Sequence, residues 1–259
     1  LKYNADVGPT KHYKWVTPCT PDGITKLSGI GTGCWQLQVK SDTLDVTDVG
    51  AYFDYPSNHD DGPKWTNAFA AASEFGYKLS APGGISNIGT TITMAKGVRL
   101  TGIGTGINGV IPSTDKSGTY VIGVLQNGTF PTVCFKLQNA NGTEQVPAPQ
   151  LSNLQIQCGF SDYSVQYNSI AGGFTDNNTT QSYMFRPVLD HIVFGGTQVA
   201  VIQMSKCFDA EIDAVEIDGG AIGIDLEGCD GAHIGSKGMV RIVGSTGHML
   251  HAITQGTFG

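Results

Sequence analysis

The chain has 259 residues, of which 36 are glycine and only 14% are charged, a composition that suits a turn-rich β protein better than a helical one. Its formal net charge of −7 argues against nucleic acid as a partner, because phosphate binding needs clustered Lys and Arg and no basic run occurs. No apolar run reaches the length of a membrane span, and no signal-peptide pattern follows Leu1.

The chain is long enough to bury a sizeable core, either as one long domain or as two short ones. It begins with Leu1 and stops at GTFG without a capping element, so we expect it to be part of a longer chain. Its six cysteines lie at 19, 34, 134, 158, 207 and 229, with no C-x-x-C pair to indicate zinc or redox chemistry. A disulfide framework is possible in a secreted chain, but at this size we expect buried free thiols.

Residues 1 to about 45 have weak periodicity and several breakers, among them TPCTPDG and LSGIGTG. Such a pattern indicates a linker or a small neck. The main domain is expected to span 46–259, with a strand and a helix at 46–76 and regular β structure from about residue 85.

The clearest predicted element is a helix over 63–75. Its apolar positions recur at i, i+3, i+4, i+7 and i+10 and form one stripe. Asp60 or Asp61 is expected to supply an oxygen to its N-terminus, Pro63 fits its first turn and Gly76 its end. The stripe comprises Trp65, Ala68, Phe69, Ala72 and Phe75.

After this helix the periodic segments read as β-strands that repeat. The sequence Cys-x-x-Ala-x-Ile occurs at 207–212 and again at 229–234, a step of 22 residues. Three other pairs advance by 23 to 25 residues: Ile192 and Val215, Val215 and Val240, and Val199 and Ile222. Three strand phases with nearly the same step predict a right-handed parallel β-helix with three strands per rung, in which Cys207 stacks on Cys229. The open end of such a coil needs a cap, and the helix at 63–75 is the natural candidate.

The segment VTDVGAYFDYPSNHDDGPKWTNAFAAASEFGYKLSAPGGISNIGTTITMAKGVRLTGIG resembles the opening of pectate-lyase-like β-helix proteins. Their strand V-T-D-F-G-A matches Val46–Ala51, and their capping-helix motif D-D-T-x-A-(I/F)-x-x-A matches Asp60–Ala72. The later motifs P-x-G-x-(Y) and G-V-x-L-x-G-x-G match Pro82–Ser86 and Gly97–Gly104. Gly-Pro-Lys-Trp after the Asp pair and Ser86 in place of an aromatic depart from the pattern. The likeness covers about residues 44 to 104 closely, and it is specific for the fold and weak for chemistry.

That family includes secreted plant-cell-wall enzymes, glucanases and bacteriophage tailspikes, most of which act on polysaccharides. The segment ahead of the capping strand looks like the neck of a tailspike. The resemblance therefore implies a homotrimeric virion protein that binds and cuts bacterial capsule or O-antigen and contacts other tail proteins through its N-terminal segment.

Hydrolysis of a glycosidic bond needs two carboxylates, whereas elimination from uronic acids needs a base and a cation. If Ile212, Val215 and Ile217 point inward, alternation places the neighbouring acids on the outer wall, with Asp218 at the bend. The competing interpretation is a solvated surface, with Glu216 beside Arg241 as an ion pair. The predicted catalytic candidates are Glu211, Asp213, Glu216, Asp218, Asp225 and Glu227.

Other chemistry has weaker support. His191, His233, His248 and His251 read as surface histidines, with His233 facing Glu211 as the best catalytic candidate among them. Cations are sparse late in the chain, which disfavours a lyase. No metal-ligand spacing or cofactor motif is found, although an acid wall could hold calcium.

An inserted loop is predicted between Ile156 and Ile192, since their separation of 36 residues exceeds one rung. Its aromatic side chains could stack on sugar rings, or they could serve a subunit contact or loop packing. The predicted substrate-binding residues are Tyr163, Tyr167, Phe174 and Tyr183.

Three functions remain open from sequence. The favoured one is a trimeric tailspike that hydrolyses surface polysaccharide. The second is a virion fibre, adaptor or receptor-binding module without an active site, and the third is a secreted, monomeric polysaccharide lyase. A shared scaffold does not choose among them.

Overall fold

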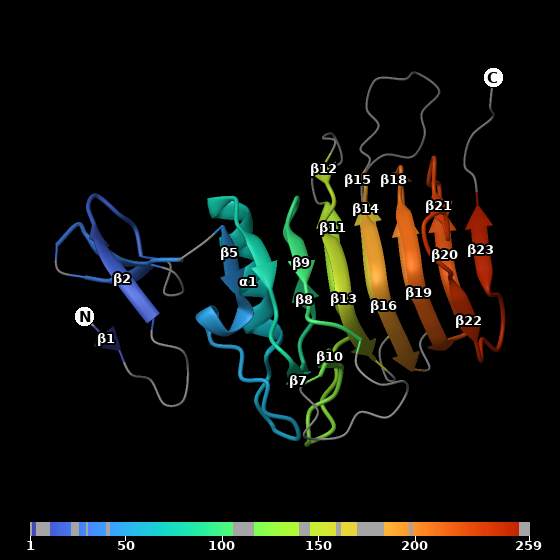
Figure 1. The fold of residues 1–259 in the computed structure, drawn as a ribbon, viewed down its shortest axis with the longest axis horizontal. Coiled ribbons are helices and arrows are strands. Elements are labelled where there is room, and N and C mark those ends of the chain that lie inside the picture. Colours follow the sequence, from blue (N-terminus) through green and yellow to red (C-terminus); the bar gives the residue numbers. More distant parts are fainter. Residues whose placement is uncertain are drawn as a thin grey trace.

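The computed structural model describes residues 2–3, 11–21, 26–29, 31–39, 42–105, 117–139, 146–158, 162–169, 184–196 and 199–253. In these ranges the protein is predominantly β, with little helix and with most strands paired in parallel in several sheets (Figure 1). The expected all-β, mostly parallel architecture is confirmed at this level.

The N-terminal part forms a small antiparallel sheet of its own. Its strands are β1 (Lys2–Tyr3), β2 (Lys11–Val16), β3 (Lys26–Ser28) and β4 (Cys34–Leu37), in the order β1-β2-β4-β3. Lys26 joins this sheet to the rest of the chain, because its ammonium group pairs with Glu74 and lies 5.0 Å from the centre of the Phe75 ring.

The predicted helix forms as α1 (Gly62–Phe75), which begins one residue earlier than expected. Asp60 Oδ1 accepts a hydrogen bond from the Gly62 N–H at 2.9 Å, whereas Asp61 at the N-cap makes no side-chain capping bond. Gly76 ends the helix with a φ of 69°. The apolar stripe is buried at Trp65, Ala68, Phe69 and Ala72 and half-buried at Phe75. It packs against the 3-10 helix η1 (Val46–Val49) and the first strands of the parallel sheets. The strand predicted over Val46–Ala51 is wrong, because Val46–Val49 form this 3-10 helix and the preceding strand ends at Asp45.

Three parallel sheets occupy the described part of the chain after residue 42. The ten-stranded sheet contains β5 (Thr43–Asp45), β6 (Lys78–Ser80), β7 (Gly84–Asn87), β9 (Arg99–Thr101), β10 (Thr119–Ile122), β13 (Gln150–Gln157), β16 (Val188–Gly196), β19 (Glu211–Gly219), β21 (His233–Ile234) and β22 (Arg241–Val243). The six-stranded sheet contains β8 (Ile92–Thr93), β11 (Val133–Asn139), β14 (Tyr163–Ser169), β17 (Ala200–Ser205), β20 (Ile222–Glu227) and β23 (Leu250–Ile253). The third contains β12 (Val146–Pro147), β15 (Met184–Phe185) and β18 (Cys207–Phe208).

The strand register follows most of the predicted repeats. Ile192 aligns with Val215 and Ile212 with Ile234. The bridge between Phe208 and Asp230 brings Cys207 beside Cys229. One predicted pair is wrong, because Ile222 aligns with Ala200 and not with Val199. Val199 precedes β17 and is 53% exposed, so the apolar residue in phase with the core is the small Ala200.

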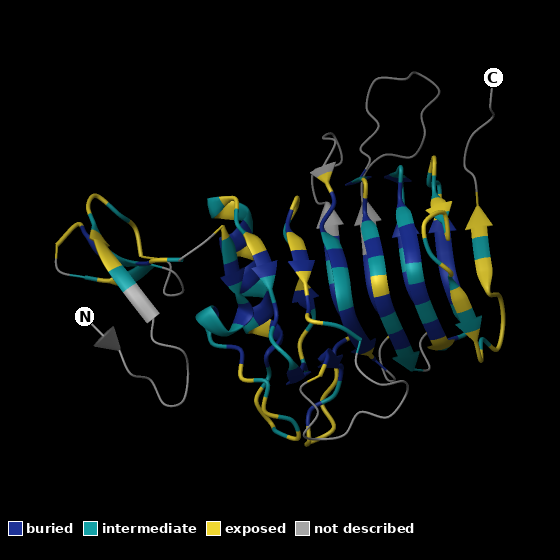
Figure 2. Ribbon diagram, viewed as in Figure 1, coloured by how far each residue is buried: buried dark blue, intermediate teal, exposed yellow. Residues whose placement is uncertain are grey.

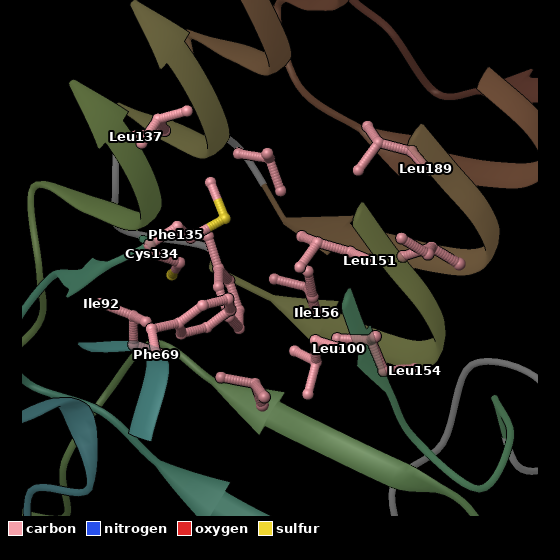
Figure 3. Packing of buried hydrophobic residues seen from close by; sticks show 14 of the residues in the cluster. Phe69, Ile92, Leu100, Cys134, Phe135, Leu137, Leu151, Leu154, Ile156 and Leu189 are labelled. Carbon is pink, nitrogen blue, oxygen red and sulfur yellow. The ribbon is translucent and has the colours of Figure 1, made fainter. Parts of the chain in front are cut away.

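The core lies between the parallel sheets and extends to α1. Figure 3 shows side chains of the six-stranded sheet facing those of the ten-stranded sheet, with Phe69 of α1 beside Ile92. Burial is greatest in the central strands and decreases at β22 and β23 (Figure 2). The labelled core residues from the two sheets are Ile92, Cys134, Phe135, Leu137, Leu100, Leu151, Leu154, Ile156 and Leu189.

The expectation of free thiols is wrong for four of the six cysteines. Cys19 is bonded to Cys34 in the N-terminal part, and Cys134 to Cys158 in the core. Cys207 and Cys229 remain free. The pairs are 15 and 24 residues apart, and no sequence spacing identifies partners that only the winding of the chain brings together.

We expect two reactive thiols per chain when the unreduced protein is denatured and treated with a thiol reagent, and six after reduction, because two disulfides protect the other four. Mass spectrometry of the alkylated peptides should assign the two to Cys207 and Cys229. Six thiols without reduction would contradict both disulfides, and none would mean that Cys207 and Cys229 are also joined.

Candidate functional site

Three adjoining cavities lie along the outer face of β13, β16 and β19. They hold about 260, 300 and 500 Å³. The middle one shares His191 and Ala214 with the smallest, and Val193, Glu216 and Arg241 with the largest. We call them together the β16–β19 groove. Its charged and amide side chains are Gln155, Gln157, Asp190, His191, Glu211, Asp213, Glu216, Asp218, Lys237 and Arg241.

A bend in neighbouring strands sets which side chains face this groove. Asn153, His191 and Ala214 have left-handed backbones, with φ of 56°, 52° and 49°. The strand register places these residues side by side, since their flanking residues pair with one another. The bend interrupts the alternation of the strand, so that Ile212 and Val215 are both buried although they are three residues apart.

Glu216 and Asp218 follow the bend on β19 and line the largest cavity. Glu216 pairs with Arg241 of β22, so the predicted ion pair across strands is confirmed. Asp218 is exposed and lies opposite Gly195 of β16. These two acids therefore share one strand face, separated only by buried Ile217.

The other two acids of β19 lie at the opposite end of the groove. Glu211 pairs with Lys237, and this hydrogen bond raises the pKa of Lys237. Asp213 is only 4% exposed, which corrects the prediction of an exposed outward acid. The loop that follows β21 covers it: its carboxylate accepts hydrogen bonds from the Lys237 N–H at 2.8 Å and from Ser236 Oγ at 3.4 Å.

The last two predicted acids do not lie in the groove. Asp225 and Glu227 belong to β20 in the six-stranded sheet. Asp225 is 7% exposed, again in contrast to the predicted open position, and its Oδ1 lies 2.8 Å from His251 Nδ1. It stands in a row of polar residues that crosses this sheet, which explains its burial: Thr93, Lys136, Gln166, Gln203, Asp225 and His251. The predicted wall of acids is thus divided between two sheets.

The predicted aromatic residues do not lie together in the groove either. Tyr163 and Tyr167 belong to β14, so this part of the predicted insertion is a regular strand of the six-stranded sheet. Phe174 and Tyr183 lie outside the described residues. Neither described tyrosine belongs to a strand that lines the groove.

The register brings His233 opposite Glu211, as predicted, but each of the two side chains pairs with a different residue. His233 Nε2 lies 3.3 Å from Asp209 Oδ1, whereas Glu211 pairs with Lys237. Asp209 also pairs with Arg186 at 2.6 Å, and this hydrogen bond lowers the pKa of its carboxyl.

Sequence reasoning did not assign Gln155, Gln157 or Gly195 to the site, although all three line the largest cavity. The glutamines alternate with buried Leu154 and Ile156 on β13, and this pattern was available in the sequence. Their alignment with β16 was not available, because the 38-residue step from Leu154 to Ile192 exceeds the repeat length.

Within the described ranges, no group of three or more His, Cys, Asp or Glu side chains is placed to hold a metal ion. Over the same part of the chain, none of the helices has the length and apolar character that a membrane span requires.

One solved structure matches this chain. Tailspike protein gp49 of Acinetobacter baumannii bacteriophage Fri1, a capsular polysaccharide depolymerase, aligns at 13% identity with a TM-score of 0.49. The alignment covers 92% of this chain and 53% of that one, so this chain spans about half the length of that tailspike. No protein-family model matches the sequence, and no curated protein matches it.

Proposed function

We propose that the protein is a phage tailspike that binds a bacterial surface polysaccharide, capsule or O-antigen, and depolymerises it by glycosidic hydrolysis in the β16–β19 groove. The observation that carries this proposal is the placement of Glu216 and Asp218 on one strand face, in a cavity of about 500 Å³. Two carboxylates at one surface cavity are the minimal equipment for this reaction.

The spacing of the two residues suits the chemistry. Residues i and i+2 of a strand lie about 7 Å apart, and the carboxyl separations used by glycosidases are about 5 to 9.5 Å. Arg241 orients the Glu216 carboxylate, which suits a base or nucleophile. Asp218 is the proposed acid, because hydrolysis needs a second carboxyl group to protonate the leaving oxygen once Glu216 serves as base or nucleophile.

The charges of the groove favour hydrolysis over elimination. A lyase needs a cation that is available to neutralise the uronate carboxylate of its substrate. Arg241 and Lys237, the Arg and Lys side chains among the described groove residues, are each paired with a glutamate. An arginine or lysine already neutralised by the protein is a poor partner for a uronate.

The same proposal includes the architecture that holds the groove. The three parallel sheets would be the faces of a right-handed β-helix with three strands per rung, and α1 would be its cap. The sequential order of β16, β17 and β18, each in a different sheet, and their pairing with the next turn support the winding. The contacts of α1 with β5, β6 and β8 support the cap.

We predicted a neck over residues 1–45, and the part of it before β5 is proposed to join other tail proteins of the virion. The functional particle is proposed to be a homotrimer. Thr43–Asp45 form β5 of the ten-stranded sheet and so belong to the main domain. The separate antiparallel sheet of β1 to β4, beyond α1 in Figure 1, supports the division. Light scattering of the purified protein should give three times the mass of one chain. A monomer would count against the trimer and would favour the secreted alternative.

The decisive experiment incubates the protein with a panel of purified capsular and O-antigen polysaccharides. Hydrolysis predicts new reducing ends without the ultraviolet absorbance of unsaturated uronate products. Reducing ends together with that absorbance would assign a lyase. Binding without any new ends would discard the enzyme in favour of a receptor-binding module.

A further inference from the structure

A glycine interrupts a row of exposed side chains near the ends of β13, β16 and β19. Gly195 of β16 aligns with Gln157 of β13 on one side and with Asp218 of β19 on the other. All three line the largest cavity of the groove. Along this row of three strands, the outer two residues carry side chains and the middle one does not.

The backbone accounts for the other two glycines of this cavity. Gly196 and Gly219 have φ of 134° and 105°, a region that side chains rarely adopt. A Cβ on Gly219 would also overlap the Gly196 carbonyl oxygen. These two residues are glycines because the turn requires them.

Gly195 has no such requirement. It is absent from the left-handed region, and among the described atoms an added Cβ would meet only Gln157 Cγ, at an ordinary contact distance of 3.7 Å. The equivalent positions on the adjacent strands carry Gln157 and Asp218, so the sheet accepts side chains in this row. Glycine in a strand often marks a place where a ligand or another backbone approaches closely.

We propose that Gly195 forms the floor of a subsite for a single sugar ring, at the point of cleavage. This inference rests on the proposed function and assigns its substrate a position. The strands of Gln157 and Asp218 are two strand spacings apart, about 10 Å, which leaves room for one ring against the bare backbone. The Gln157 amide both donates and accepts hydrogen bonds, as ring hydroxyl groups require, while Asp218 faces the scissile oxygen.

The test adds a side chain at position 195. Gly195→Leu is compared with Gly195→Ala and with Ser205→Leu, which adds similar bulk to β17 of the six-stranded sheet. On the polysaccharide cleaved in the screen above, Gly195→Leu is expected to lower kcat/KM about 100-fold and Gly195→Ala severalfold. Ser205→Leu should retain the wild-type value. Calorimetry with the oligosaccharide product of the wild-type reaction should show weaker binding in the same order.

The outcomes separate the subsite from the function. If wild-type protein cleaves no polysaccharide, the proposed function fails and the subsite falls with it. If wild-type protein cleaves and Gly195→Leu cleaves and binds equally well, the subsite alone is wrong. Thermal unfolding of each variant reports folding, and should Gly195→Leu not fold, Gly195→Ala decides: wild-type kcat/KM and product affinity in that variant would overturn the subsite.

Discussion

Replacing Glu216 with Gln, or Asp218 with Asn, is expected to lower the rate of depolymerisation about 1,000-fold, because each removes one of the two carboxyl groups that hydrolysis needs. Each amide keeps the size of the side chain and removes its ability to accept or release a proton. The measurement is the initial rate of reducing-end formation on the polysaccharide that the wild-type protein cleaves. The double variant should lose little more than either single one, since the two groups act in one step.

Stability should change little in these variants. The pair between Glu216 and Arg241 lies at the surface, where an ion pair contributes about 1 kcal/mol or less. Glu227→Gln provides the matched control, because Glu227 is an exposed acid on β20, outside the groove. Its activity should equal that of the wild type. Full activity of both Glu216→Gln and Asp218→Asn would place the chemistry elsewhere on the molecule, whereas loss in Glu227→Gln as well would indicate a general effect of surface charge.

The sequence was most informative where structure repeats. A residue that recurs after 22 to 25 positions stacks on its predecessor, and apolar residues that do so must share the core. This reasoning placed Ile192 beside Val215, Ile212 beside Ile234 and Glu216 beside Arg241. The helix could be predicted equally well, because its apolar stripe and the glycine after it are local signals.

The sequence was least informative where one residue departs from the repeat. Ala214 adopts a left-handed backbone without being glycine, asparagine or aspartate, so its sequence gives no sign of the bend. That bend decides which acids of β19 reach the groove. The burial of Asp213 depends on a loop that folds back over it. The pairing of the disulfide cysteines depends on how the chain winds. Each of these features is set by tertiary contacts, and local pattern cannot supply them.

Ser86 shows a departure from a sequence motif that the structure explains. This buried hydroxyl accepts a hydrogen bond from Trp65 Nε1 at 2.8 Å and donates one to Asp61 Oδ2 at 2.7 Å. The carboxylate also accepts the Tyr52 N–H at 2.8 Å and the Phe53 N–H at 3.2 Å. Asp61 therefore links the start of α1 to β7 and to the segment after η1, a structural role that its sequence position at the helix N-terminus only partly indicated.

Asp61→Ala is expected to lower the free energy of unfolding by about 3 kcal/mol, because it leaves two backbone N–H groups and the Ser86 hydroxyl without their acceptor in a site where Asp61 is 1% exposed. Denaturation by urea, followed by tryptophan fluorescence, measures the change. Asp230→Asn serves as control, since this exposed aspartate should change stability by less than about 0.5 kcal/mol. Equal stability of the wild type and Asp61→Ala would contradict the role given to the network.

The pH dependence of Asp61→Asn tests the same network by its electrostatics. Burial raises the pKa of Asp61, so the folded state holds its proton to a higher pH than the unfolded state does. The stability that this proton provides is complete below the carboxyl's unfolded pKa of about 4 and is lost as pH rises through the folded pKa. Asparagine does not titrate, so the cost of the substitution should be larger in acid than at neutral pH. A cost that grows with rising pH would mean that the folded site stabilises the ionised carboxylate, and the assignment of burial as the dominant influence would then be wrong.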